Sequence, residues 1–206
     1  MWTSTAVRVK RFLRYAASHA HSSEEAGQST WSRRTERKCT LIEIRKEQPG
    51  DISAIRDVNR GAFGQDQEGN IVDALRANGA VTLSLVATLN GRVVGHIMYS
   101  PLHVGDVIGA GLGPVAVLPE HQRQDIGTKL VETGNRKLKD AGCSFVIVLR
   151  HAHYYPRFGF RPASAHGITC EWRVADDVFM LLVLDPRQMQ GVSGLAKYRA
   201  EFSTVS

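Results

Sequence analysis

The sequence predicts a three-layer α/β domain, in which helices cover a mixed, mostly antiparallel sheet with a central parallel βαβ crossover. Three observations support this prediction. Two β-rich segments meet at Asn90-Gly91, the strongest two-residue signal for a β-hairpin. Residues 113–141 read as an apolar strand, a polar loop and a helix. Residues 143–149, CSFVIVL, are almost wholly apolar, as in a strand buried on both faces of a parallel sheet.

Composition favours one domain with a tail. The chain has 206 residues, of which 43% are apolar, enough for one complete core. No apolar run approaches the length of a membrane span, so we expect no membrane partner. Cys39, Cys143 and Cys170 are odd in number and widely spaced, which argues against a disulfide framework or a zinc site and fits a reducing compartment.

Residues 1–40 form a basic leader, and we expect the domain to occupy residues 41–206. The leader is rich in Ser, Thr, Arg and Ala and has no acidic residue before Glu24. On a helical wheel its apolar and basic residues separate, which resembles a mitochondrial transit peptide. A disordered leader and a misassigned start codon remain alternatives. We therefore expect a cytoplasmic protein, with the mitochondrial matrix as the alternative.

The net charge of +6 belongs mostly to this leader. It holds eight basic and three acidic residues, which leaves 18 basic against 17 acidic residues in the rest of the chain. A protein that reads nucleic acid needs its basic patch on the folded part. The sequence therefore predicts no nucleic-acid partner.

The first part of the domain predicts a strand followed by two helices. Residues 41–45 alternate as a strand, and Asp51 after Pro49 is a candidate N-cap for a helix over 51–62. A second helix is predicted over 68–78. The positions expected to face the core are Ile52, Ile55, Val58, Ala62, Ile71, Val72 and Leu75.

The middle of the chain predicts the sheet. Strands over 81–89 and 92–100 are followed by a longer antiparallel strand over 104–117. Glycines at 105, 109, 111 and 113 indicate a turn or bulge inside this third strand. The helix of the crossover spans about 126–141, and Gly142 ends it.

The last part of the chain predicts short elements. Residues 154–158 make one or two helical turns, and residues 159–163 reverse the chain. Residues 167–172 and 178–184 are predicted to form a final antiparallel pair.

The segment between the third strand and its helix predicts a phosphate site. Unpaired backbone N–H groups at a helix N-terminus and the helix dipole both face a bound anion. We interpret the segment as the pyrophosphate site of a coenzyme. The predicted coenzyme-binding residues are Val115, Ala116, Val117, Gln122, Arg123, Gln124, Asp125, Ile126, Gly127 and Thr128.

These residues resemble the GNAT superfamily of acyl-CoA-dependent N-acetyltransferases. That family carries a strand of the form VAVxP followed by Q/R-x-x-G-x-G/A. Here Val115–Pro119 match the first part and Gln122–Gly127 match the second. Asp125 stands where the family has its first glycine. Either the loop keeps a negative φ and points Asp125 outward, or coenzyme binding is weakened.

A second motif supports the resemblance, which covers residues 41–202. Residues 151–163, HAHYYPRFGFRPA, are similar to the GNAT segment in which a tyrosine precedes x-x-x-G-F. Tyr155, four residues before Gly159, occupies the position that the family places near the coenzyme sulfur, whereas Tyr154 is expected to pack. Residues 68–76, 91–101 and 170–186 resemble a branch of small, mostly bacterial predicted N-acetyltransferases.

The resemblance implies acetyl-CoA as co-substrate, no metal, and direct acetyl transfer to a primary amine of a small molecule or peptide, by a monomer or homodimer. An amine attacks only when neutral, so a base must remove its proton. Glu68 and Glu171 are the candidate bases. Backbone amides of Val115–Val117 are candidates to stabilise the oxyanion, and the family pattern assigns protonation of the leaving thiolate to Tyr155.

Several alternatives stay open on sequence alone. Asp125 and Arg150 favour a protein that binds or senses acyl-CoA with a partner and has weak catalysis. His151 and His153 lack a third metal ligand, and His96 is either a satisfied sheet residue or a cleft residue. Cys143 begins a buried strand and is expected to be an inert thiol.

Overall fold

The computed structural model describes residues 41–205, so the predicted leader, 1–40, lies outside the described residues. The helices are α1 (Ile52–Phe63), α2 (Gln67–Ala77) and α3 (Ile126–Asp140), with short 3-10 turns η1 (Pro49–Asp51), η2 (Pro119–His121), η3 (Tyr155–Phe158), η4 (Ala163–His166), η5 (Asp176–Val178) and η6 (Ala200–Val205). The strands are β1 (Ile42–Lys46), β2 (Leu83–Leu89), β3 (Arg92–Val104), β4 (Val107–Val117), β5 (Phe145–Leu149), β6 (Arg161–Pro162), β7 (Ile168–Cys170), β8 (Phe179–Val183) and β9 (Gly194–Lys197).

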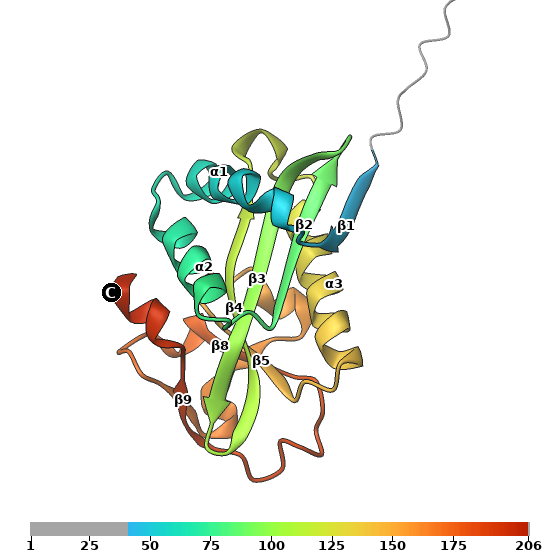
Figure 1. Ribbon diagram of the computed structural model, residues 1–206. Helices are drawn as coiled ribbons and strands as arrows, with labels where there is room; N and C mark the ends of the chain where they lie inside the picture. Colours follow the sequence, from blue (N-terminus) through green and yellow to red (C-terminus); the bar gives the residue numbers. More distant parts are fainter. Residues whose placement is uncertain (1–40, 206) are drawn as a thin grey trace, which may run out of the picture. The chain divides into compact units, whose positions relative to one another are not determined.

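The strands form one mixed sheet in the order β1-β2-β3-β4-β5-β8-β6 (Figure 1). Neighbours on this path are antiparallel except β4 and β5, which are parallel and are joined through α3. β9 pairs with the end of β3 and, in parallel, with β7. The predicted fold class, a mostly antiparallel sheet with a central parallel crossover, is confirmed.

The helices cover both faces of the sheet, and two adjacent residues of β3 show this. A Cβ added to Gly95 would lie 3.0 Å from Ile126 and 3.1 Å from Leu130 of α3. The next residue, His96, must face the opposite side, because side chains alternate along a strand. His96 lies 3.3 Å from Asn59 of α1. The face that α3 covers is therefore opposite the face that α1 covers (Figure 1).

The first helices bury most of the residues that the sequence predicted to face the core, and Ala62 is partly buried. Ile55, Val58, Ile71, Val72 and Leu75 are all buried, whereas Ile52, at the start of α1, is 39% exposed.

The residue before α1 behaves differently from the prediction. The carboxylate of Asp51 makes no capping hydrogen bond to this helix. It accepts the backbone N–H of Gln48 at 2.8 Å and pairs with Arg45 at 2.6 Å instead. Asp51 therefore ties the short turn η1 to β1.

The predicted antiparallel pair of residues 167–172 and 178–184 is wrong. β8 pairs with β5 and β6, and β7 pairs in parallel with β9. Phe179, Met180 and Leu181 of β8 are all buried, so the strand gains most by inserting beside the equally apolar β5. β9, which the sequence analysis did not predict, supplies the partner of β7.

β4 contains the predicted irregularity, and it lies where the central strands part. Ile97 of β3 pairs with Val115 of β4, and Tyr99 pairs with Leu112. Between these pairs, two residues of β4 therefore face one residue of β3. These two residues, Gly113 and Pro114, form a β-bulge. The pairing of β4 with β5 ends at Leu112. Beyond the bulge β4 pairs with β3 alone, which leaves its other edge open.

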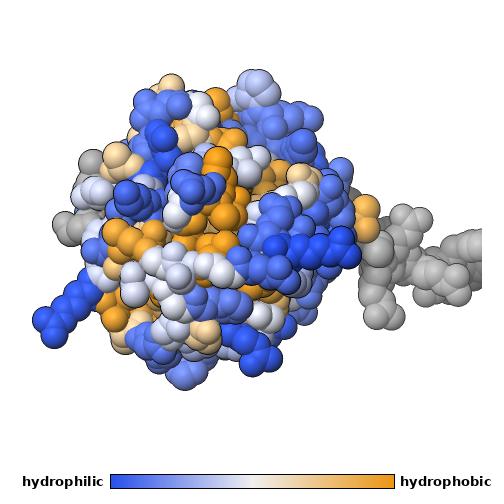
Figure 2. Space-filling view, turned by 90° about the horizontal axis from the view of Figure 1, so that it is seen from below, coloured by the Kyte–Doolittle hydropathy of each residue, from blue (hydrophilic) through white to orange (hydrophobic). Residues whose placement is uncertain are grey.

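Some apolar side chains reach the surface. Ile108, at the start of β4, is 58% exposed, and Leu195 of β9 is 43% exposed. Figure 2 shows apolar residues gathered across the middle of the face seen from below, between hydrophilic ones. Every helix within residues 41–205 is too short or too polar to span a lipid bilayer.

Candidate active site

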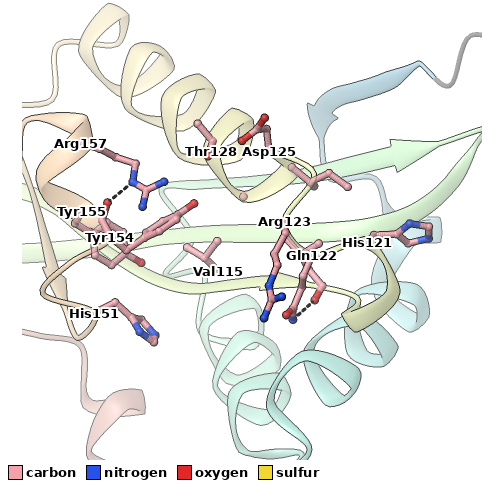
Figure 3. Close-up of a pocket in the computed structure, with 13 residues that line it drawn as sticks. Val115, His121, Gln122, Arg123, Asp125, Thr128, His151, Tyr154, Tyr155 and Arg157 are labelled. Carbon is pink, nitrogen blue, oxygen red and sulfur yellow. Dashed lines mark hydrogen bonds between the residues drawn. The ribbon is translucent and has the colours of Figure 1, made fainter.

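A pocket of about 340 Å³ lies where β4 parts from β5. Its walls come from the end of β4, the loop and first turn of α3, and the segment after β5 (Figure 3). The lining residues are Val115, Val117, His121, Gln122, Arg123, Asp125, Ile126, Gly127, Thr128, His151, Tyr154, Tyr155 and Arg157. Two separate sequence motifs thus meet around one hollow.

Most of the predicted coenzyme-binding residues line this pocket, and two do not. Ala116 is 1% exposed and stands opposite His96, so its side chain points to the face that α1 covers. Gln124 is exposed, and its amide donates to the carbonyl of Glu120 at 3.2 Å. Neither side chain lines the pocket, although the chain neighbours of both residues do.

The N-terminus of α3 presents free donors to the pocket. The first helical hydrogen bond runs from the N–H of Lys129 to the carbonyl of Asp125 at 2.9 Å. The N–H groups of Ile126, Gly127 and Thr128 precede it and so have no acceptor within the helix. Asp125 makes no side-chain cap. With the dipole of a 15-residue helix behind them, these amides form a site for an anion.

The loop in front of α3 takes a left-handed conformation at two residues that are not glycine. Arg123 has φ +60° and Asp125 has φ +59°. The alternative in which the loop keeps a negative φ at Asp125 is therefore wrong. The carboxylate of Asp125 is turned away from Val115 and Arg123 (Figure 3). A non-glycine residue in this region costs about 1 kcal/mol or more, so the loop stores strain beside the anion site.

The open edge of β4 also presents backbone donors. The N–H of Leu118 bonds the carbonyl of Val94 on β3 at 3.0 Å. Because backbone groups alternate in direction along a strand, the N–H groups of Val115 and Val117 point the other way, toward the space beyond the end of β5. The carbonyl of Val117 accepts the side-chain amide of Gln122 at 3.1 Å. Both N–H groups are thus available to a ligand between the strands.

Tyr155 forms the inner wall of the pocket and is only 4% exposed. Its ring packs edge-on against Phe160, with 5.5 Å between ring centroids. Burial raises the pKa of the Tyr155 phenol, with a further contribution from Tyr154. The phenol therefore stays protonated at neutral pH and can act as a proton donor.

Tyr154 lies nearer the mouth of the pocket and contacts α3. Its hydroxyl would lie 2.9 Å from a Cβ at Gly127, so only glycine fits there without displacing the phenol. Burial raises the pKa of Tyr154, while a hydrogen bond with Thr128 opposes that shift. The guanidinium of Arg157 lies 4.6 Å above the ring and donates to the Tyr154 carbonyl at 3.0 Å (Figure 3).

The two candidate bases lie outside this pocket. Glu68 is half-buried in the first turn of α2, where it accepts the side-chain amide of Gln65 at 3.1 Å. Glu171 follows β7, and its Oε2 accepts the backbone N–H of Tyr198 at 2.8 Å. The structure does not bring Glu68 and Glu171 together.

The histidines separate into three cases. His151 lines the pocket, with φ +57°, and His153 does not. His96 is fully buried, with Nε2 at 3.1 Å from Ser84 Oγ and Nδ1 at 3.3 Å from Asn59 Nδ2. Burial, aided by the charge of Arg76, lowers the pKa of His96 to about 3. His96 is thus a neutral, hydrogen-bonded residue of the sheet.

Among residues 41–205, no cluster of three or more His, Cys, Asp or Glu side chains is arranged to hold a metal ion. Burial raises the pKa of the Cys143 thiol, which donates to the carbonyl of Phe145 at 3.3 Å. This contact fits the predicted unreactive role of that cysteine.

Sequence analysis did not single out His121 or Arg157. Arg157 follows Tyr154 by three residues, and on one helical turn this spacing puts both on the same side. That signal was available inside the second motif. His121 belongs to the turn η2, and no spacing rule placed it at the pocket.

Comparisons with known proteins agree with this geometry. A model of the Acetyltransferase (GNAT) family matches residues 41–160. The Escherichia coli K12 protein YhbS, named an uncharacterized N-acetyltransferase, is 34% identical over 163 residues, which cover 78% of this chain and 98% of YhbS.

Two solved structures are also similar. The E. coli GNAT family N-acetyltransferase YhbS in complex with CoA has a TM-score of 0.78 and 32% identity, covering 81% of this chain and 94% of that one. A GNAT family acetyltransferase from Brucella melitensis in complex with acetyl-CoA has a TM-score of 0.67 and 39% identity, covering 79% and 99%.

Proposed function

This chain belongs to the acetyltransferase (GNAT) family, and we propose that it transfers an acetyl group from acetyl-CoA directly to a primary amine. One observation carries the proposal. A single pocket joins the free N–H groups of α3, the open edge of β4 and the buried phenol of Tyr155. Similar chains from E. coli and B. melitensis were solved with CoA and acetyl-CoA, which supports the same ligand here.

The chain's own residues fit this co-substrate. The amides of Ile126, Gly127 and Thr128 would hold the pyrophosphate, and the cationic side chain of Arg123 would neutralise part of its charge. The missing side chain at Gly127 leaves the space that both Tyr154 and a phosphate group need. The N–H groups of Val115 and Val117 would bind the carbonyl groups of the acylated arm between the strands.

The reaction needs two proton transfers besides the acyl transfer. A base first takes a proton from the ammonium, and the neutral nitrogen then attacks the thioester carbonyl carbon, forming a C–N bond. The N–H groups of Val115 and Val117 stabilise the resulting oxyanion. When the C–S bond breaks, the Tyr155 phenol protonates the thiolate, and the phenolate recovers a proton from the new amide nitrogen. One proton is released to solvent through the base.

Glu171 is the better candidate for this base. It is held by Tyr198, whose ring contacts Gly111 of β4 one residue before the pairing with β5 ends. Glu68 lies in the first turn of α2, and the described contact of its carboxylate is with Gln65 alone. We therefore assign proton removal to Glu171 and keep Glu68 as the alternative.

A thiol-release assay with a panel of primary amines tests the proposal. The wild-type protein is expected to release CoA only when an amine is present and to convert that amine to its acetamide, detected by mass spectrometry. Tyr155→Phe should still bind CoA by calorimetry but lose about 10²-fold or more in kcat. Tyr99→Phe is the matched control, because it removes a buried phenol that donates to Asn135 of α3 at 3.2 Å and does not line the pocket.

Two results would contradict the proposal. Thiol release that is slow, independent of amines and unchanged in Tyr155→Phe would favour a sensor of acyl-CoA over an enzyme. Failure of the wild-type protein to bind CoA would remove both functions.

A further inference from the structure

Two buried hydroxyl groups on the described part of the chain have no hydrogen-bond partner. They are Oγ of Ser100, a residue with no exposed surface, and the phenol oxygen of Tyr198. A buried polar group without a partner destabilises a fold, so each such group calls for a reason. Neither is used by the coenzyme pocket described above.

The two residues meet at one point of the sheet. Ser100 of β3 stands directly opposite Gly111 of β4. A Cβ added to Gly111 would lie 3.3 Å from Cε1 and 3.5 Å from Cδ1 of Tyr198, so one edge of the phenol ring lies close to this glycine. Gly111 pairs with Ile147 of β5, one residue before β4 and β5 part. Both hydroxyl-bearing residues therefore lie beside the opening.

They lie on the face opposite the coenzyme pocket. Val115, which lines that pocket, pairs with Ile97, so both point to the α3 side of the sheet. Ser100 is three residues further along β3 and must point to the other side. A ligand bound between the separated strands β4 and β5 would therefore meet the coenzyme pocket on one face of the sheet and Ser100 and Tyr198 on the other.

An aromatic ring and a carboxylate complete this cluster. The rings of Trp172 and Tyr198 are 5.1 Å apart between centroids, and Phe202 packs on Tyr198 at 5.6 Å. Glu171 Oε2 accepts the N–H of Tyr198 at 2.8 Å. Burial, and then the proximity of Cys170 and Glu171, raise the pKa of the Tyr198 phenol, so this hydroxyl keeps its proton. A carboxylate beside an indole ring is a suitable environment for an organic cation.

We propose that Ser100, Glu171, Trp172 and Tyr198 form the acceptor subsite of this acetyltransferase, and that its acceptor is a primary alkylammonium compound. This inference rests on the proposed function. Glu171 and Trp172 attract the cation, and Glu171 takes its proton. The oxygen atoms of Ser100 and Tyr198 accept the N–H groups of the neutral amine and hold its lone pair toward the thioester. Because both oxygens are buried, the half-buried Trp172 side chain must shift to admit the amine.

Single variants of the full chain test the two hydroxyls. Ser100→Ala and Tyr198→Phe are each expected to raise the KM for an alkylamine about ten-fold or more, with no change in the Kd for CoA. Their melting temperatures should be unchanged or higher, because each variant removes a polar atom that has no partner in the free protein. Ser144→Ala is the control. That serine is also buried, but its Oγ donates to Gln188 at 2.7 Å, so this variant should lose stability and keep its KM.

The carboxylate is tested by substrate choice. Wild-type protein should prefer an alkylamine to an ω-amino acid of the same chain length, because Glu171 repels the substrate's carboxylate. Glu171→Gln should reduce this preference at least five-fold. An alkylamine KM within two-fold of wild type in both hydroxyl variants, or an unchanged preference in Glu171→Gln, would overturn the subsite while leaving acetyl transfer intact. Wild-type protein that binds CoA but acetylates no amine would instead overturn the proposed function, and this inference with it.

Discussion

Asp125 combines two unfavourable features at the proposed pyrophosphate site. Its backbone is left-handed, at φ +59°, and its side chain carries a negative charge near the N-terminus of α3. Replacing it by Gly removes both the strain and the charge. We predict that Asp125→Gly binds CoA about five-fold more tightly, near the ~1 kcal/mol expected for a charge at a helix terminus. Isothermal calorimetry measures this change.

Asp125→Asn separates charge from strain. Asn tolerates the left-handed region and is neutral, so it should give the part of the gain that comes from charge alone. The melting temperature of Asp125→Gly should change little, because loss of the favourable interaction of Asp with the helix dipole offsets the relief of strain. Weaker binding by Asp125→Gly would show that the carboxylate assists binding.

Gly127 is the position where the coenzyme pocket and Tyr154 compete for space. A Cβ there would lie 2.9 Å from the Tyr154 hydroxyl oxygen. Helix propensity alone predicts that Gly127→Ala gains up to about 1 kcal/mol of stability. We predict the opposite sign, with lower stability and a Kd for CoA raised about ten-fold, because Tyr154 must move.

Two further variants isolate the cause in that experiment. Adding Tyr154→Phe to Gly127→Ala removes the oxygen that the new Cβ would meet, and should restore most of the stability. Gly69→Ala in α2 is the matched control, since a Cβ there meets nothing within 4 Å and should stabilise the protein. A stabilised Gly127→Ala single variant would refute the steric explanation.

At the scale of residues, the sequence patterns identified residues that line the pocket but not the backbone conformations of its loop. Val115, Gly127 and Tyr155, which belong to the two motifs, all line this pocket. The motifs did not reveal that Arg123 and Asp125 both adopt positive φ, because Arg carries no signal for that conformation and Asp only a weak one. The partnerless hydroxyl of Ser100 is equally invisible in sequence, since it depends on which chain segment packs above β3.

At the scale of elements, local sequence patterns predicted most of the strands but not all of the strands with which they pair. The Asn90-Gly91 turn determines its own hairpin, so the pairing of β2 with β3 was predicted correctly, although β3 continues to Val104, past its predicted end at residue 100. No turn signal beside the apolar β8 indicates which strand pairs with it. In the structure β8 pairs with β5, whereas β7 pairs with β9. β9 has one buried residue, Ala196, and no clear alternation, which explains why sequence analysis missed it.

The turn η6 connects to α2 through one carboxylate. Glu201 accepts Asn78 Nδ2 at 2.8 Å and pairs with Arg199 at 3.0 Å. The hydrogen bond from Arg199 is the largest cause that lowers the pKa of Glu201, from 4.5 to about 2. Because the folded pKa is lowered, this contribution to stability is present above pH 4.5 and is lost as the pH falls toward 2.

We therefore predict that Glu201→Gln lowers the free energy of unfolding by about 1 kcal/mol at pH 7 and by less at pH 3. Urea denaturation at the two pH values measures the difference. Glu120→Gln, at an exposed position, is the control. An equal loss at both pH values would show that the carboxylate's charge does not stabilise this connection.

At the scale of the whole molecule, the described lining residues of the coenzyme pocket all lie within residues 115–157, inside the segment that the family model matches. We predict that deletion of residues 1–40 leaves the Kd for CoA within two-fold of the full chain, as calorimetry would measure. Loss of CoA binding in the shortened protein would place part of the site in the leader and revise the proposed domain boundary.

His96 links the layers of the molecule, because it contacts Asn59 of α1 and Ser84 of β2 from its position on β3. Ser84 in turn donates to Glu47, and Glu47 pairs with Arg76 of α2 at 2.6 Å. Glu47 lies 3.9 Å from His96, yet its charge is engaged by Arg76, so burial dominates and lowers the pKa of His96 from 6.5 to about 3. The folded protein therefore holds His96 neutral where the unfolded chain protonates it.

The sign of the pH dependence follows directly. Between pH 6.5 and about 3 the unfolded state binds one more proton at His96 than the folded state does, so stability falls as the pH falls, by at most about 1.4 kcal/mol per unit. Of these two contributions, only that of His96 changes between pH 6.5 and 4.5, because the contribution of Glu201 is lost below pH 4.5. The two contributions can therefore be measured separately. His96→Gln carries an amide that can bond Ser84 and Asn59 but cannot titrate, so it should lose less stability than wild type between pH 6.5 and 4.5. Denaturant unfolding at half-unit pH steps measures both slopes, and equal slopes in the two proteins would show that another group controls stability in this range.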